Sequence, residues 1–343
     1  MVDIQTSMNN QLSLQSAEIE GRRGMGVGTD SYGFRWSSNN RTQTRFKDAL
    51  DFLEHCHQFG AGGIQAVIGD WDPEFVARFR AKAESWHMYL EGQIGLPRDQ
   101  ADVQRFESRV RIAKAAGASI VRSVMLNGRR YETFDSVESF KQAGQKAWET
   151  LVRAEPIVRS HRVRLAIENH KDWRAPQMLD ILKRIDSEYV GLCVDTGNSI
   201  ALLEDPLEVI AAYAPWAFTS HLKDMAVQEY EDGFLLSEVP LGEGFLDLGK
   251  IITTLRQAKP GLPLNLEMIT RDPLKVPCLT KKYWVTFEDL PANVLAGTLA
   301  LVRANASRKP LPQTTGLSDE QRLNFEDDNV RKSFAYAQKH LGL

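Results

Sequence analysis

Short apolar runs alternate with longer amphipathic stretches along the chain from residue 24 onward. Each run is followed by a polar turn and then by apolar side chains at helical spacing. Two helical stretches begin with Asp72-Pro73 and Asp205-Pro206, and this placing of proline is typical of a first helical turn. The predicted strands are 24–29, 63–68, 86–92, 119–125, 164–169, 190–195, 217–221 and 263–268. The predicted helices are 45–59, one beginning at residue 72, 100–116, 136–160, 175–185, 205–214, 247–258 and 286–304.

This regular alternation predicts an α/β fold with parallel strands inside and helices outside. Eight strand–helix units fit a closed (β/α)8 TIM barrel better than an open sheet. No glycine-rich phosphate motif follows a strand, which disfavours a Rossmann or P-loop fold. We expect residues 1–23 to form an N-terminal arm and 24–304 the barrel. Residues 305–343 are expected to form a helical C-terminal extension, with a final helix near 318–341.

Composition narrows the class of protein and of partner. With 42 basic and 45 acidic side chains, the formal charge is −3, which offers no cationic field for a nucleic acid. The N-terminal residues lack the pattern of a signal peptide, and no apolar window is long enough to span a bilayer. Three distant cysteines do not suggest a disulfide framework. We therefore expect a cytoplasmic protein with a small-molecule substrate and neither a nucleic-acid nor a membrane partner.

Polar side chains end four successive apolar runs in the second half of the chain. In a TIM barrel the carboxyl ends of the strands form the active-site rim, so these side chains are expected to meet there. Three carboxylates in one place repel one another unless a cation neutralises them. A carboxylate and imidazole set suits Mn²⁺ first and Mg²⁺, Co²⁺ or Zn²⁺ as alternatives, and the lack of a thiolate disfavours a structural zinc site. The predicted ligands of one divalent ion are Glu168, Asp195, His221 and Glu267.

Five strings around these residues resemble the sugar phosphate isomerase/epimerase superfamily. They are IENH at 167–170, CVDTGN at 193–198, HLKD at 221–224, PLGEGFLD at 240–247 and NLE at 265–267. The resemblance covers roughly residues 24–304 and implies a xylose isomerase-like (AP endonuclease 2-like) TIM barrel whose metal ligands match the same four residues. It also implies that Glu168 and Glu267 act as the acid/base pair of an epimerase.

The sequence departs from the sugar epimerases at two positions. Many epimerases have His three residues after the metal-binding Asp and Arg six residues after the metal-binding His, whereas this chain has Asn198 and Val227. His170 adds a candidate catalytic base or substrate donor. We expect a metal-dependent isomerase or epimerase that removes a proton next to a sugar or polyol carbonyl and forms an enediolate. The alternative is a lyase that eliminates a β leaving group from a 3-keto glycoside or dehydrates an inosose-like compound.

Further residues near the expected rim are candidates for substrate binding: Glu91, Arg122, Asn198 and Lys223. Arg122 could instead pair with Glu91 or Glu168, and Lys223 with Asp224. Trp36 and Trp71 could stack on a sugar, although packing is the commoner fate of such residues. His55 and His57 fall within a helix and are expected to be structural or exposed. The segment 242–244 is expected to be a turn that delivers Asp247 as a helix cap.

Two other classes of protein remain open at this point. A DNA-repair endonuclease of the same superfamily would need more histidines for a multi-metal centre and a basic face. A non-catalytic sugar-binding subunit would be favoured by the loss of a ligand, but all four ligand positions are filled. Related barrels pair as dimers or tetramers, so a homo-oligomer is possible for this chain.

Overall fold

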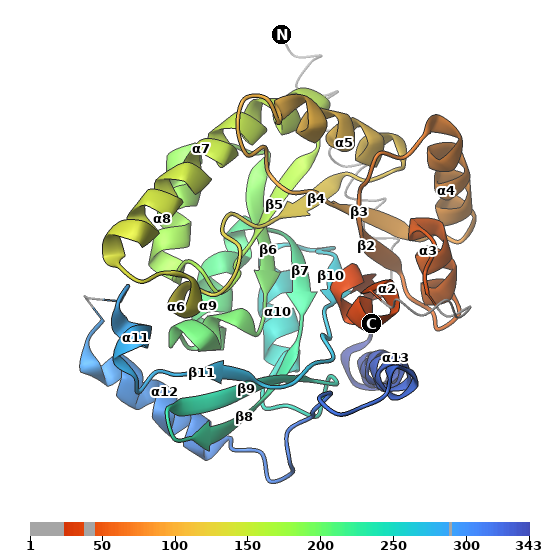
Figure 1. The fold of residues 1–343 in the computed structure, drawn as a ribbon. Coiled ribbons are helices and arrows are strands. Elements are labelled where there is room, and N and C mark those ends of the chain that lie inside the picture. Colours follow the sequence, from red (N-terminus) through yellow and green to blue (C-terminus); the bar gives the residue numbers. More distant parts are fainter. Residues whose placement is uncertain (1–23, 38–44, 288–289) are drawn as a thin grey trace.

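The computed structural model describes residues 24–37, 45–287 and 290–343, and the expected arm at 1–23 lies outside this range. Within the described residues, eight parallel strands close into a barrel (Figure 1) in the order β1-β2-β3-β4-β5-β6-β7-β10. The predicted (β/α)8 TIM barrel is therefore confirmed. The barrel strands are β1 Gly26–Gly28, β2 Gly63–Val67, β3 Tyr89–Gln93, β4 Ile120–Ser123, β5 Arg164–Glu168, β6 Val190–Asp195, β7 Ala217–Leu222 and β10 Leu264–Leu266.

Long helices connect successive strands and cover the outside of the barrel (Figure 1). Side-chain caps fix where several of them begin: the carboxylate of Asp48 accepts the backbone N–H groups of Leu50 and Asp51, and Asp72 accepts that of Phe75. Within the described chain, no helix is long and apolar enough to cross a membrane. The helices of the first seven units are α3 Ala49–His57, α4 Pro73–Ser85, α5 Val103–Ala115, α7 Val137–His161, α8 Ala175–Ile185, α9 Pro206–Tyr213 and α10 Leu248–Ala258.

The segment between β7 and α10 contains strands that the sequence pattern did not predict. Strands β8 (Asp224–Tyr230) and β9 (Gly233–Val239) form an antiparallel hairpin, and β11 (Leu274–Val276) pairs with β9. The hairpin has its own buried cluster, which includes Val227 and Leu236. Most of its residues are buried, and the small sheet is an insertion between the strand and the helix of the seventh barrel unit.

The helix that completes the ring is not the predicted one. Helix α12 (Ala292–Ala304) forms within the predicted segment 286–304, but its buried Val302 belongs to the cluster around the hairpin. Helix α13 (Asp319–Tyr336) instead contributes Val330 and Phe334 to the main barrel core. It contacts α3 through Asp327 and His55, and His340 and Leu341, which follow it, line a cavity together with residues of α10. The C-terminal extension therefore supplies the eighth outer helix. Short helices α2 (Gly33–Ser37), α6 (Arg130–Thr133) and α11 (Lys281–Trp284) lie in loops.

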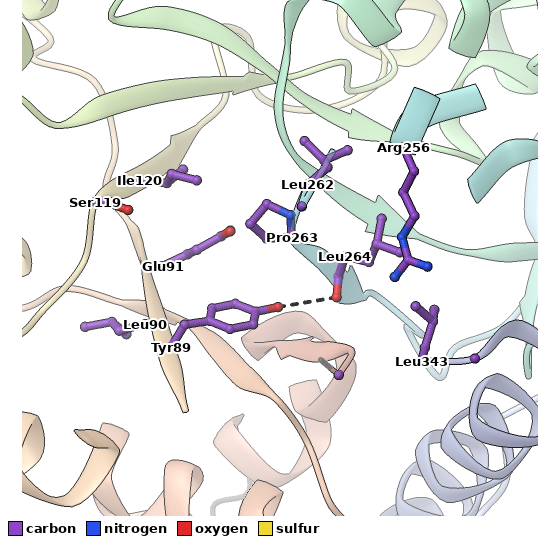
Figure 2. Close-up of a pocket in the computed structure, with 13 residues that line it drawn as sticks. Tyr89, Leu90, Glu91, Ser119, Ile120, Arg256, Leu262, Pro263, Leu264 and Leu343 are labelled. Carbon is purple, nitrogen blue, oxygen red and sulfur yellow. Dashed lines mark hydrogen bonds between the residues drawn. The ribbon is translucent and has the colours of Figure 1, made fainter. Parts of the chain in front are cut away.

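The barrel interior contains a buried polar layer instead of the usual aliphatic one. Tyr89, Asn265, Thr219, Gln65 and Glu91 meet there through side-chain hydrogen bonds. At the amino-terminal end of the barrel, a cavity of about 410 Å³ begins beneath this layer (Figure 2). None of the four predicted metal ligands lines this cavity.

Candidate metal centre

The four predicted metal ligands converge above the polar layer. Glu168 and Asp195 are the last residues of β5 and β6, His221 lies on β7, and Glu267 follows β10 directly. One ligand atom from each lies within 4.8 Å of all the others. All four side chains are buried, with exposed fractions of 3% or less. This is the arrangement expected when strand ends deliver carboxylates and an imidazole to one point.

The orientation of His221 fits a metal ligand. Its Nε2 lies 2.8 Å from Gln65 Oε1, and Gln65 Nε2 in turn donates to Glu91 Oε2 at 3.0 Å. Nδ1 faces the cluster, 3.2 Å from Glu267 Oε1, and is buried without a hydrogen-bond partner among the described residues. A histidine whose outer nitrogen donates a hydrogen bond presents the other nitrogen's lone pair to a metal. The buried cluster therefore fits a metal site.

Cations flank the carboxylates of this cluster. The Arg122 guanidinium donates from Nε to Glu168 Oε2 at 2.7 Å. Lys223 Nζ lies 2.9 Å from Asp195 Oδ2 and 2.6 Å from Glu267 Oε2. Burial opposes ionisation of Glu168, but Arg122, His221 and His170 together outweigh it and lower the pKa of this carboxyl to about 2. Burial also opposes ionisation of Glu267, whose pKa is nevertheless held well below its ordinary value by His221 and Lys223.

The DTGN string explains how Asp195 is held. Its Oδ1 accepts the backbone N–H groups of Gly197 at 2.9 Å and Asn198 at 2.8 Å. Asn169 pairs with the backbone N–H and C=O of Asp195, which fixes β6 against β5. Oδ1 is thus occupied by hydrogen bonds from the turn, and Oδ2 faces the cluster.

The HLKD and PLGEGFLD strings form one structural unit beside the centre. The carboxylate of Asp224 accepts backbone N–H groups of Gly242, Gly244 and Leu246. A Cβ on Gly244 would lie 2.1 Å from Asp224 Oδ1, so only glycine permits this close approach. The expected turn at 242–244 is confirmed, and Asp247 caps α10 by accepting the N–H of Lys250.

The remaining predicted site residues differ in how near they lie to the cluster. Asn198 donates to Glu168 Oε1 at 3.2 Å, and Lys223 and Arg122 contact the carboxylates directly. His170 follows β5, and its Nδ1 is buried without a hydrogen-bond partner in the described chain. Burial lowers the pKa of His170 to about 4, so the ring is neutral at physiological pH. Contact of these side chains with a substrate stays a prediction.

Glu91 lies deeper than the strand-end position that the sequence suggested. It sits within β3, and its Oε2 accepts hydrogen bonds from Gln65, Thr219 and Asn265. Burial raises its pKa, although those hydrogen bonds oppose the shift. Figure 2 shows Glu91 beside the cavity at the amino-terminal end of the barrel. Its structural role is to hold Gln65, and its contact with a substrate stays a prediction.

The aromatic and histidine residues outside the rim have packing roles. Trp36 packs on Phe46 and Phe52, and Trp71 packs on the aromatic side chains of α4. His57 stacks on Trp86 with ring centroids 4.0 Å apart. His55 Nε2 lies 3.1 Å from Asp327 Oδ1, which ties α3 to α13.

Four residues near the centre were missed by sequence reasoning: Gln65, Lys171, Glu238 and Arg271. Gln65 lies inside an apolar strand, where period-two alternation could have placed it facing inward. Lys171 directly follows the IENH string, so its position near the rim could have been read from the sequence. Glu238 comes from the unpredicted hairpin, and Arg271 pairs with it at 3.1 Å (Nε to Oε2).

The closed barrel and the buried carboxylate–histidine cluster at its strand ends place this chain among TIM-barrel proteins with a candidate divalent-metal centre. The chain belongs to the xylose isomerase-like TIM barrel family, whose model matches residues 53–284. It is 28% identical over 239 residues to the 3-oxo-isoapionate decarboxylase of Pectobacterium atrosepticum, a match that covers 68% of this chain and 81% of that protein. The chain is therefore an enzyme of this superfamily, as predicted.

Solved structures show the same fold at low sequence identity. A D-psicose 3-epimerase has a TM-score of 0.61 at 14% identity, with 93% of this chain and all of that chain covered. A xylose isomerase-like TIM barrel protein from Mycobacterium smegmatis, in complex with magnesium, has a TM-score of 0.56 at 17% identity. That match covers 82% of this chain and 99% of the other.

Proposed function

We propose that this enzyme is a metal-dependent decarboxylase of a 3-oxo sugar acid. The observation that carries the proposal is the state of Glu168. Oε2 of this carboxylate accepts from Arg122 and Oε1 accepts from Asn198. A carboxylate with both oxygens held in this way is poorly placed to remove a proton from carbon. Decarboxylation needs no such base, because the bond that breaks joins two carbons.

The candidate ligands and their neighbours each have a defined part. Glu168, Asp195, His221 and Glu267 would hold one divalent ion, for which we propose Mn²⁺, with Mg²⁺, Co²⁺ and Zn²⁺ as alternatives. Such an ion would polarise a substrate carbonyl and stabilise the negative charge that develops on its oxygen.

Loss of CO₂ leaves the electron pair of the broken bond on the carbon next to the carbonyl, and a proton must then be added to that carbon. Arg122 and Lys223 keep the carboxylates oriented during these steps. The 28% identity to a 3-oxo-isoapionate decarboxylase supports this reaction type.

Isomerisation or epimerisation, the reaction expected from the sequence, is the second candidate. It is favoured by the presence of two glutamates, Glu168 and Glu267, whose carboxylate oxygens lie 3.4 and 3.2 Å from His221 Nδ1. Two carboxylates could exchange a proton on opposite faces of one carbon. The β-elimination alternative has no observation of its own in the described residues.

The proposal is tested by incubating the protein, loaded in turn with each of the four ions, with 3-oxo-isoapionate in deuterium oxide. We expect CO₂ release that stops on chelation and returns with Mn²⁺, and one solvent deuterium on carbon in the product. Deuterium exchange into recovered substrate without CO₂ release would favour the isomerase or epimerase instead. Full turnover after confirmed metal removal would reject both reactions.

A further inference from the structure

Lys171 is a buried cation that lacks a carboxylate partner. Its side chain is 3% exposed, and its ammonium donates a hydrogen bond to the neutral Oδ1 of Asn198. Among the residues that the structure describes, no carboxylate oxygen lies within 4.0 Å of its Nζ. An ammonium removed from water without a counterion costs several kcal/mol, so such a group is retained where a ligand supplies the missing charge.

The carboxylates around Lys171 are in contact with other cations. Lys223 takes Asp195 and Glu267, and Arg271 takes Glu238. Burial lowers the pKa of Lys171 to about 8, and the charges of Lys223 and Arg271 act in the same direction. The side chain still carries its proton at neutral pH, so a cation without a carboxylate in direct contact lies beside the metal centre.

The place of Lys171 relates it to the reacting groups. Asn198 lies between it and the cluster: Oδ1 accepts from Lys171, and Nδ2 donates to Glu168 Oε1 at 3.2 Å. A ligand group at Lys171 would therefore lie one side chain away from the candidate metal ligands. One ammonium beside one amide matches a singly charged carboxylate. A phosphate is typically held by several backbone N–H groups as well.

We propose that Lys171 and Asn198 form a carboxylate subsite, so that the substrate is a sugar acid and not a neutral sugar. This inference rests on the proposed function, which it extends by naming the group that recognises the acid. The carboxylate of the substrate would take the position opposite the Lys171 ammonium and supply the direct ionic contact that no described residue makes with it.

The test uses unreactive probes that differ only at one end. D-gluconate and D-glucitol share a polyol chain and differ in a carboxylate at carbon 1, and D-glucitol 1-phosphate carries a phosphate at the same carbon instead. Binding of each is measured by calorimetry to the full-length protein, both metal-loaded and metal-free. We expect gluconate to bind about 10- to 100-fold more tightly than glucitol. The preference should persist without metal, because Lys171 is not a candidate ligand.

Two variants assign the preference to the subsite. Lys171→Met should abolish the preference for gluconate and leave glucitol affinity unchanged, whereas Lys183→Met, on the exposed face of α8, should change neither. The melting temperature of Lys171→Met should equal or exceed that of the wild type, because a buried charge without a carboxylate in direct contact is removed. A marked loss of stability would assign Lys171 a structural role and overturn the proposal.

Three binding results would also overturn it: no acid preference in the wild type, a preference that survives Lys171→Met, or Lys171-dependent binding of the phosphate alone. The experiments distinguish a failure of this inference from a failure of the proposed function. If Lys171-dependent gluconate binding is found but CO₂ is never released from a 3-oxo acid, only the decarboxylase proposal is wrong.

Discussion

At the scale of single residues, the candidate metal centre depends on partners that the sequence does not reveal. The four predicted ligands could be found because each ends an apolar run, and strand ends meet at one rim. Gln65, in contrast, does not end an apolar run. It lies within an apolar strand, and only closure of the barrel brings it next to His221. Whether a polar residue inside a strand faces the barrel axis or an outer helix depends on a register that local sequence does not fix.

Gln65 should control metal affinity without being a ligand. Replacing it by Leu removes the acceptor for His221 Nε2, so the ring loses its fixed tautomer and orientation. We expect metal affinity, measured by calorimetry, to fall about 10- to 100-fold. Glu91→Gln is the matched control, since a carbonyl at the position of Oε2 can accept the same three hydrogen bonds and should preserve affinity. Unchanged affinity in Gln65→Leu would refute the positioning role.

Asp195 and His170 should separate metal binding from turnover. Asp195→Ala removes a ligand candidate and its charge, so bound metal and activity should be lost together. His170→Ala should keep the metal and lower turnover, because the ring lies after β5 and outside the four-residue cluster. Metal content by elemental analysis, beside the rate of substrate conversion, checks both. Equal metal loss in the two variants would show that this division of roles is wrong.

At the scale of elements, the barrel strands and most helices could be predicted from periodicity, but the hairpin β8–β9 could not. It interrupts the strand–helix alternation after β7, and its burial comes from α12 and β11, which lie far along the chain. The periodicity therefore predicts no strand between residues 221 and 247. The omission matters for the site, because this hairpin delivers Glu238 beside Lys223, at 3.7 Å.

Contacts between α13 and the first barrel unit should contribute measurably to stability. Asp327 accepts from Tyr32 and lies 3.1 Å from His55 Nε2. Burial opposes its ionisation, but hydrogen bonds from His55 and Arg331 prevail and lower the pKa of Asp327. Asp327→Asn should reduce the free energy of unfolding by about 1–3 kcal/mol at pH 7.

The effect of Asp327 should depend on pH in a defined direction. Its folded-state pKa is depressed, so the stabilisation is present above the ordinary Asp pKa of about 4 and is lost as the pH falls through the lower folded value. Urea unfolding of both proteins should give a constant difference from pH 7 to about pH 5 that shrinks below about pH 4. Asp328→Asn, at an exposed neighbouring position, should show no such difference.

At the scale of the whole molecule, the C-terminal segment packs against the first barrel unit and completes the outer layer of helices. Helix α13 packs on the barrel core beside α3 and serves as the eighth outer helix, while the helix expected there covers the hairpin. Its polar side chains also reach rim loops: Asn329 donates to Thr270 after β10, and Ser333 accepts the N–H of Leu241 after β9. The sequence predicted a C-terminal helix but not its place, because helical periodicity shows which face of a helix is apolar and not which surface of the barrel it covers.

Removal of residues 305–343 should therefore unfold the whole barrel, and the remaining residues should not stay folded without them. The deletion would expose the core surface that Val330 and Phe334 cover, and it would remove the contacts to the rim loops. We expect the shortened chain to lose cooperative thermal unfolding and near-ultraviolet circular dichroism. Phe334→Ala, a milder change, should cost about 3–5 kcal/mol, whereas Lys332→Ala on the exposed face should be neutral. A shortened chain that unfolds cooperatively at the full-length melting temperature would show that seven outer helices are enough to stabilise this barrel.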